Sequence, residues 1–381
     1  MTLAPVRPKS EPVGGPGPDL ARATPYLALD VNRAVRQYSL IADAFGAGTV
    51  HYAVKANPHP HLVGELVLAG GRFDVASPAE LDLCLQAGAD VSQIIYSHPM
   101  KRRADIVYAH RHGVELFVAD SAAEIDKVAE AAPGGAVLVR LATTGAGSDW
   151  PLSGKFGCPA TEVVRLLMRG SARGLRAAGV TFHVGSQQCD PGAWAAPIQA
   201  AAEIFDDVRA AGLRPWLLDI GGGLPAGHEG GQPGLEAYRE AIFSSLDDHF
   251  GTRHPRLIIE PGRAVVGDAG QLVTRVIGVT ARGGRRWVYL DAGVYTGLVE
   301  TLGEAIRYRI LTGRDGDALA PAVLAGPTCD SVDVLYEKTP VLLPLSIAEG
   351  DVITFASAGA YTATYSTVGF NGFAPLPTVL L

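Results

Sequence analysis

The sequence is poor in cysteine and contains no apolar run long enough to cross a bilayer. Its 381 residues include 4 cysteines, Cys84, Cys158, Cys189 and Cys329, and no two of them form a CxxC pair. This excludes a disulfide framework and a closely spaced zinc motif. A membrane helix needs roughly 18 consecutive apolar residues, and the N-terminus lacks the charged and apolar regions of a signal peptide. We therefore expect a soluble, cytoplasmic protein.

Positive charge is also scarce. Lysine and arginine total 32 against 39 aspartate and glutamate residues, which gives a net charge of −7. Proteins that hold nucleic acid or an anionic membrane surface usually present an excess of basic side chains. The composition therefore favours neither partner, and we expect the ligand to be a small molecule.

Proline and glycine, in contrast, are concentrated at the start of the chain. Residues 1–24 have little apolar periodicity, which predicts a flexible tail. The apolar run that opens residues 25–34 predicts a strand that joins a distant sheet. Residues 31–45 then have the pattern of an amphipathic helix.

The main part of the chain alternates apolar strand candidates with helical patterns. This repetition predicts an α/β fold, a (β/α)₈ barrel of the TIM type over residues 35–265. From residue 266 to residue 381 the pattern changes to short β runs, including residues 271–279, 287–291, 323–325 and 351–355, which predicts a C-terminal β domain. The strand candidates are residues 49–56, 72–77, 93–97, 114–119, 136–142, 180–185, 216–221 and 257–262.

Polar residues gather where these strands end. Barrel active sites lie at the carboxyl ends of the strands, so the shared placement of these residues predicts one site. The residues at or next to the strand ends are Lys55, Asp74, Arg140, His183, Asp219, Glu260 and Arg263.

Lys55 is the residue around which we expect the site to be organised. A lysine at a strand end is either a solvated surface residue or an amine whose pKa is lowered by partial burial. The second kind is a nucleophile for a carbonyl group. The stretch YAVKANP leaves both readings open when it is taken alone.

Three glycines at residues 221–223 follow the seventh strand candidate. Such a loop either makes a tight turn or brings backbone N–H groups close to a phosphate. The dinucleotide motif GxGxxG is absent from the first βα unit, so a single phosphate is the better hypothesis.

Two strand-end side chains have alternative explanations. Glu260 ends an apolar strand and needs a cationic partner. It is either half of an ion pair with Arg263 or a carboxylate that keeps a ring nitrogen protonated. His183 is either a core histidine, a general acid/base or a group that stacks on a ring.

The C-terminal part holds the segment GPTCDSVD, which places a thiol beside acids in a Gly-Pro turn without zinc-ligand spacing. Cys329, Asp330 and Tyr361 each have an ordinary structural explanation when taken singly. Neither GxSxG nor HExxH occurs, which disfavours serine hydrolases and zinc proteases. No metal site is expected.

Taken together, the motifs resemble the fold type III pyridoxal-phosphate decarboxylases, which include the ornithine, lysine and diaminopimelate decarboxylases. The likeness runs from about residue 25 to the C-terminus and is greatest to the bacterial ornithine/lysine decarboxylases. It implies an alanine-racemase-like architecture of barrel and β domain. The motifs are YAVKANP, FDVAS, HVGSQ, DIGGG, EPGR, GPTCDS, GAY and FNGF, in the order of the family.

The resemblance also implies the roles of individual residues. Lys55 would hold the aldehyde of pyridoxal 5'-phosphate as a Schiff base, with His183 stacked on the ring and Glu260 paired with the ring nitrogen. Asp74 and Arg140 match positions close to the cofactor. The positions that match the phosphate site and its surroundings are Ser186, Gly222, Gly223, Gly262, Arg263 and Tyr361.

The family further implies a homodimer with active sites at the subunit interface. Cys329, the implied proton donor, and Asp330, the implied partner of the distal ammonium group, would come from the other subunit. Lys155 and Asp333 match an ion pair across that interface.

The substrate expected from the resemblance is L-ornithine, giving putrescine, or L-lysine, giving cadaverine, as in polyamine biosynthesis. The predicted substrate residues are Asp330, Glu304, Tyr295 and Phe370. Gly303 stands where bacterial relatives often carry an acid, so arginine, diaminopimelate, diaminobutyrate or a substrate of specialised metabolism stays an alternative.

Two other classes compete with a decarboxylase. Alanine racemases share the fold but place an arginine at the ring nitrogen, where this sequence has Glu260. A non-enzymatic homologue is the other rival, and the presence of Lys55, Cys329 and Asp330 together disfavours it.

Overall fold

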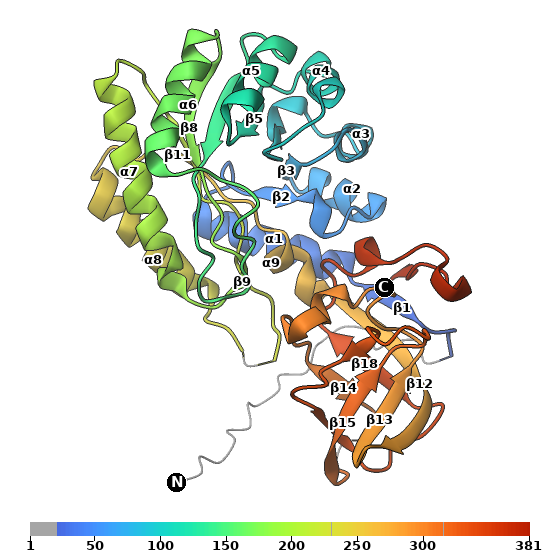
Figure 1. Cartoon of the computed structure of the whole chain (residues 1–381). Helices are drawn as coiled ribbons and strands as arrows, with labels where there is room; N and C mark the ends of the chain where they lie inside the picture. Colours follow the sequence, from blue (N-terminus) through green and yellow to red (C-terminus); the bar gives the residue numbers. More distant parts are fainter. Residues whose placement is uncertain (1–20, 230, 315) are drawn as a thin grey trace, which may run out of the picture.

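The computed structural model describes residues 21–229, 231–314 and 316–381. Most of the tail predicted at residues 1–24 lies outside these ranges. The described chain forms a barrel surrounded by helices and a β domain, with α9 (Arg263–Val266) between the two (Figure 1).

The barrel is an eight-stranded parallel sheet in which each strand pairs with its neighbours along the chain. It closes through a parallel bridge between Val50 and Ile259, where the His51 N–H donates to the Ile259 carbonyl at 2.9 Å. The predicted eight-stranded barrel is therefore confirmed. The strands are β2 (His51–Ala53), β3 (Arg72–Val75), β4 (Ile94–Tyr96), β5 (Leu116–Ala119), β6 (Ala136–Arg140), β8 (Arg176–Thr181), β10 (Leu217–Asp219) and β11 (Arg256–Ile258).

Helices cover the outside of the barrel, and their starts are set by local side chains. Ser77 and Ser121 cap α3 and α5 by accepting hydrogen bonds from the N–H groups of Glu80 and Glu124. The helices are α1 (Val31–Phe45), α2 (Pro60–Leu68), α3 (Pro78–Gln86), α4 (Arg103–Arg111), α5 (Ala122–Ala131), α6 (Ala160–Ala172), α7 (Ala195–Ala210) and α8 (Leu235–Phe250).

The strands are shorter than the apolar runs that predicted them, especially at their carboxyl ends. β2 ends at Ala53, and Lys55 lies in the single 3₁₀ turn η1 (Val54–Ala56). β8 ends at Thr181, two residues before His183. These residues are therefore in loops next to the strands, where side chains are free to turn over the barrel mouth.

Apolar side chains at alternate strand positions fill the barrel, so its centre is a packed core. The site is consequently restricted to the loops above it. The members of this cluster are Ile95, Val118, Ala136, Leu138, Ala178, Leu217 and Ile258.

The β domain is a nine-stranded mixed sheet built around the long strand β12 (Gly270–Arg282). It also contains β1 (Tyr26–Leu29), β13 (Arg285–Leu290), β14 (Ile310–Thr312), β15 (Leu319–Ala325), β16 (Val334–Leu335), β17 (Val341–Pro344), β18 (Val352–Ala356) and β19 (Thr378–Leu380).

The N-terminal strand crosses from the barrel side of the chain into this domain. β1 pairs antiparallel with β12 and parallel with β19, and its blue ribbon lies among the orange and red strands of Figure 1. It is shorter than the run predicted at residues 25–34, because α1 begins at Val31. The domain boundaries at residues 34/35 and 265/266 stay a prediction.

Candidate active site

A hollow of about 460 Å³ lies above the carboxyl ends of the barrel strands, beside the β domain. It collects side chains from both parts of the molecule. The predicted site residues that line it are Lys55, Arg140, His183, Ser186, Glu260 and Tyr361.

The amine of Lys55 is held by Asp74, which lies on β3. The Lys55 Nζ is 2.7 Å from Asp74 Oδ2, and Ser97 Oγ donates to the other oxygen of this buried carboxylate. Burial of the amine alone would lower the pKa of Lys55, but the charge of Asp74 and the hydrogen bond that Asp74 accepts outweigh it and raise that pKa above its ordinary value. Of the two readings that the sequence left open for Lys55, the structure does not support the amine with a lowered pKa.

Glu260 follows β11 and is 9% exposed. Within the described residues, its Oε1 atom has no hydrogen-bond partner. Burial raises the pKa of this carboxyl well above its ordinary value, and the nearby charges of Asp219 and Asp74 act in the same direction. Glu260 is therefore a buried carboxyl group that binds its proton more tightly than usual and has one oxygen available to a ligand.

His183 is a neutral ring. Burial, together with the charges of Arg140 and Lys55, lowers its pKa to about 3. Its Nδ1 accepts a hydrogen bond from the Gly185 N–H at 3.0 Å, so the proton is on Nε2. A neutral, oriented imidazole suits stacking on a flat ligand better than it suits proton transfer.

Arg263 begins α9 and is 3% exposed. Its Nε and Nη2 atoms donate to Ser186 Oγ at 3.3 and 3.2 Å, and the ring of Tyr361 lies 5.0 Å from the guanidinium carbon. Among the described residues, Nη1 has no hydrogen-bond partner. Sequence reasoning offered Glu260 as a possible ion-pair partner for Arg263, but the structure pairs Arg263 with Glu300 instead.

Three predicted site residues are glycines that pack closely against the residues around the site. A Cβ atom at Gly222 would lie 2.7 Å from the Glu260 carbonyl oxygen and 3.1 Å from His183 Nε2. At Gly223 the backbone φ is +115°, and at Gly262 a Cβ atom would meet Ala56 at 2.8 Å. Side chains are therefore excluded at all three predicted glycines by close packing or by backbone conformation.

Four of the predicted residues form a second cluster, which does not line this hollow: Tyr295, Cys329, Asp330 and Phe370. The Tyr295 hydroxyl donates to Asp330 at 2.9 Å, and the Tyr295 and Phe370 rings lie 4.6 Å apart. The exposed Cys329 has its sulfur 3.4 Å from Asn371 Oδ1. Within one subunit the structure therefore brings Lys55 and Cys329 to different places.

Glu304 belongs to neither group. Its carboxylate accepts hydrogen bonds from the N–H groups of Lys338 and Thr339 and lies 3.6 Å from Arg307. Burial raises its pKa, but these partners and the Thr339 hydroxyl outweigh burial and lower the pKa below its ordinary value. The structure thus gives Glu304 a local role and does not bring it to the hollow.

Asp333 is also used within its own chain. It is 2% exposed and accepts hydrogen bonds from the Val294 N–H at 2.7 Å and from the Thr328 N–H at 3.1 Å. These bonds leave its carboxylate enclosed within one chain, and the expected ion pair with Lys155 of another subunit stays a prediction.

Sequence reasoning missed several residues that line the hollow, including Glu300, Tyr365 and His98. Glu300 is the most informative, because it is a buried acid in the otherwise apolar run GLVE. An isolated charge in such a run was a usable signal. The sequence around Tyr365 and His98 gave no comparable signal.

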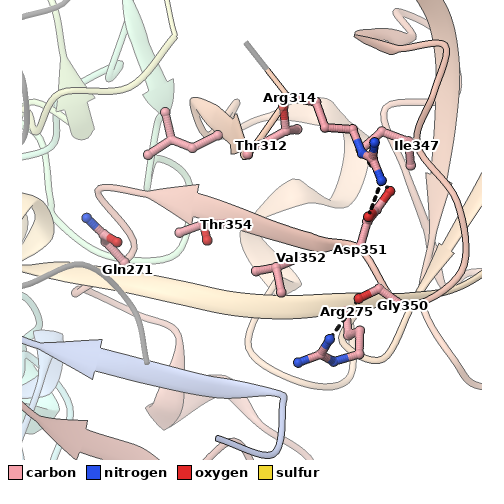
Figure 2. Close-up of a pocket in the computed structure, with 11 residues that line it drawn as sticks. Gln271, Arg275, Thr312, Arg314, Ile347, Gly350, Asp351, Val352 and Thr354 are labelled. Carbon is pink, nitrogen blue, oxygen red and sulfur yellow. Dashed lines mark hydrogen bonds and ion pairs between the residues drawn. The ribbon is translucent and has the colours of Figure 1, made fainter. Parts of the chain in front are cut away.

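A larger hollow of about 570 Å³ lies in the β domain and is shown in Figure 2. Its charged side chains already form ion pairs or hydrogen bonds with other groups of the protein. Arg314 and Asp351 form an ion pair at 2.6 Å, and Arg275 donates to the Gly350 carbonyl at 2.7 Å. It contains none of the predicted site residues, so the smaller hollow is the candidate active site.

The polar atoms of the smaller hollow fit pyridoxal phosphate. They offer an amine for the aldehyde at Lys55, an unpaired carboxyl oxygen for the ring nitrogen at Glu260 and, for the phosphate, the hydroxyl of Ser186, which accepts hydrogen bonds from Arg263. No group of three or more His, Cys, Asp or Glu residues in the described chain is arranged to hold a metal ion. No helix in this part of the chain is long and apolar enough to span a membrane.

Comparison with known proteins agrees with this chemistry. Residues 31–267 match the family model described as pyridoxal-dependent decarboxylase, pyridoxal binding domain. The lysine/ornithine decarboxylase of Selenomonas ruminantium is 35% identical over 358 residues, which cover 94% of this chain and 89% of that protein.

Solved structures agree over the same extent. The lysine/ornithine decarboxylase from Vibrio vulnificus complexed with cadaverine superposes with a TM-score of 0.84 at 34% identity and covers 94% of both chains. The arginine decarboxylase of Paramecium bursaria Chlorella virus bound to agmatine gives a TM-score of 0.86 at 29% identity, covering 94% of this chain and 96% of that one. This chain therefore belongs to the pyridoxal-dependent decarboxylases that act on basic amino acids, and its cofactor is pyridoxal phosphate.

Proposed function

We propose that this enzyme decarboxylates L-ornithine or L-lysine, releasing putrescine or cadaverine, with Lys55 as the cofactor lysine. The observation that carries the proposal is the unpaired Oε1 of Glu260 in the same hollow as the Lys55 amine. An acid at this position supports a protonated ring nitrogen, which decarboxylation needs and which alanine racemases lack.

Each side chain of the hollow has a separate role in this proposal. Bound pyridoxal phosphate supplies the electron sink for the carbon that loses CO₂. Glu260 would hold a proton shared with the ring nitrogen, and neutral His183 would pack on the ring. Asp74 accepts a hydrogen bond from Lys55 and keeps the Lys55 amine charged when no carbonyl group is bound. Ser186, Arg263 and the glycine backbone would hold the phosphate.

The second cluster supports a site shared between two subunits. Cys329 is exposed, and Asp330 is held by Tyr295, but neither lines the hollow of its own chain. We propose that in a homodimer Cys329 delivers a proton to the carbon that has lost CO₂. Asp330 receives the distal ammonium group, while Tyr295 and Phe370 shape the space beside it.

Mixing two defective variants tests this arrangement. Lys55→Ala and Asp330→Ala should each lose most turnover of ornithine and lysine. In an equal mixture about half the dimers are heterodimers with one intact site, so roughly a quarter of the activity should return. A mixture that stays as inactive as its components would contradict the shared site.

The choice of substrate depends on the distal charge. A buried ion pair with Asp330 would reject amino acids that lack a side-chain cation. A screen of ornithine, lysine, arginine, diaminopimelate and diaminobutyrate for release of CO₂ should give the highest kcat/KM with ornithine or lysine. A higher value with arginine or diaminobutyrate would replace the proposed substrate.

We also propose that the enzyme works in the cytoplasm. All four cysteines are free thiols, which agrees with a reducing compartment.

A further inference from the structure

The phosphate end of the hollow already contains an anion of the protein. Glu300 is 3% exposed and lines the same hollow as Lys55. Its two carboxylate oxygens lie 2.7 and 2.9 Å from Arg263 Nη2. A buried carboxylate therefore contacts the arginine that the proposed function assigns to the cofactor phosphate.

The geometry of this pair leaves part of the guanidinium unused. Both oxygens of Glu300 contact the same nitrogen, Nη2, whereas a two-pronged pair would engage two nitrogens. Nη1 therefore stays buried without a partner among the described residues. The Glu300 carboxylate therefore offsets the charge of Arg263 without engaging the whole guanidinium group.

Glu300 is not the only group that orients Arg263. Ser186 Oγ accepts from Nε and Nη2, and the Tyr361 ring covers one face of the guanidinium at 5.0 Å. The guanidinium would therefore keep its place if the charge of Glu300 were removed. What Glu300 adds beyond orientation is negative charge next to the place of a negatively charged phosphate.

We infer that Glu300 is a built-in counter-ion that weakens the hold of the pocket on the cofactor phosphate. It compensates the buried Arg263 when the phosphate is absent and opposes the phosphate when it is present. This inference rests on the proposed function, because it takes Arg263 and Ser186 as the phosphate site.

The pair also joins the two parts of the molecule. Arg263 begins α9 at the end of the barrel, whereas Glu300 lies in the β domain in the 3₁₀ segment η5 (Val299–Glu304). The affinity for the phosphate is thus set partly by the segment that leads from Tyr295 to Glu304. This one segment therefore contains both Glu300, which contacts Arg263, and Tyr295, which is predicted to bind the substrate.

Glu300→Gln tests the inference, because glutamine keeps an oxygen that accepts from Nη2 and removes the charge. We expect the dissociation constant of pyridoxal phosphate to fall at least about tenfold, since a like charge next to the phosphate has been removed. The dissociation constant of inorganic phosphate, measured by calorimetry on protein stripped of cofactor, should fall similarly. The affinity for pyridoxal, which lacks the phosphate, should stay unchanged.

The control variant is Glu337→Gln. Glu337 pairs with Arg285 at 3.6 Å on the surface of the β domain, so this change removes an ion pair away from the hollow. It should leave all three affinities as they are in the unmodified protein. Unfolding midpoints of both variants check that they fold.

The outcomes separate this inference from the proposed function. Unchanged or weaker phosphate binding in Glu300→Gln would overturn the counter-ion role, even if the lysine-bound cofactor absorbs near ~420 nm as expected. Equal tightening of pyridoxal would also overturn it, because the effect would not pass through the phosphate. If no such band forms in the unmodified protein, the proposed function itself fails.

Discussion

At the scale of single residues, the protonation of Lys55 is decided by a neighbour 19 positions away in the sequence. The sequence predicted that Lys55 and Asp74 share a site, but it could not give the 2.7 Å contact that keeps the amine charged. That contact depends on the exact pairing of β2 with β3, where Ala53 is the partner of Asp74. The sequence therefore predicted which residues share the site, but it did not predict the effect of Asp74 on the pKa of Lys55.

Replacing Asp74 by asparagine should therefore lower the pKa of Lys55. Burial would then act with less opposition, and more of the amine would be neutral near pH ~7. We expect Asp74→Asn to capture pyridoxal phosphate faster than the unmodified protein at neutral pH, with the pH profile of the capture rate displaced downward. Stopped-flow absorbance of the bound cofactor measures this, and a profile displaced upward would contradict the role of Asp74.

The prediction for Glu304 depended on matching one position in a segment. Here Gly303 and Glu304 both have positive φ, at +67° and +66°. This turn directs the Glu304 carboxylate to Lys338 and Thr339. Sequence spacing carries no information about such a backbone reversal, so the side chain could not have been placed from the sequence.

At the scale of elements, the regular βα alternation was readable because it depends on apolar runs of the right length. The short β strands of the C-terminal domain were less so. Runs at residues 271–279, 287–291, 323–325 and 351–355 correspond to β12, β13, β15 and β18. The strands β14, β16, β17 and β19 were not predicted, because two to four residues give too little alternation for recognition.

The turn that carries Cys329 depends on Asp333 and on two glycines packed against it. A Cβ atom at Gly326 would lie 2.2 Å from Asp333 Oδ1, and one at Gly293 would lie 2.0 Å from the same atom. The carboxylate organises the turn by accepting N–H groups from Val294 and Thr328. GPTCDS is therefore a structural motif as well as a chemical one.

Gly326→Ala should destabilise this turn. Overpacking of this kind costs about 1–3 kcal/mol, so the free energy of unfolding in urea should fall by that amount. Gly278→Ala is the matched control in the same domain, because a Cβ atom there meets nothing within 4 Å. Equal stability of the two variants would show that Asp333 does not fix the turn.

At the scale of the whole molecule, buried neutral histidines should make stability depend on pH. His51 lies at the base of the barrel and His228 next to the β domain, and they are 1% and 6% exposed. Burial lowers the pKa of each from 6.5 to about 4. Because the unfolded chain binds protons more readily, this stabilisation is present above pH ~6.5 and is lost as the pH falls towards ~4.

When the pH falls from ~7.5 to ~5, each of these histidines should lower the free energy of unfolding by on the order of 2 kcal/mol. Urea unfolding of the cofactor-free protein at the two pH values measures the loss. His228→Gln should reduce the difference, since glutamine does not titrate. A difference that is unchanged in this variant would mean that other groups dominate the acid sensitivity.

Lys55 is proposed to carry the cofactor of a decarboxylase for basic amino acids. The most direct test is the release of labelled CO₂ from L-ornithine and L-lysine labelled at the carboxyl carbon, with pyridoxal phosphate present. We expect release by the unmodified protein and none above background by Lys55→Ala. Formation of the D-isomer without CO₂, or equal release by both proteins, would contradict it.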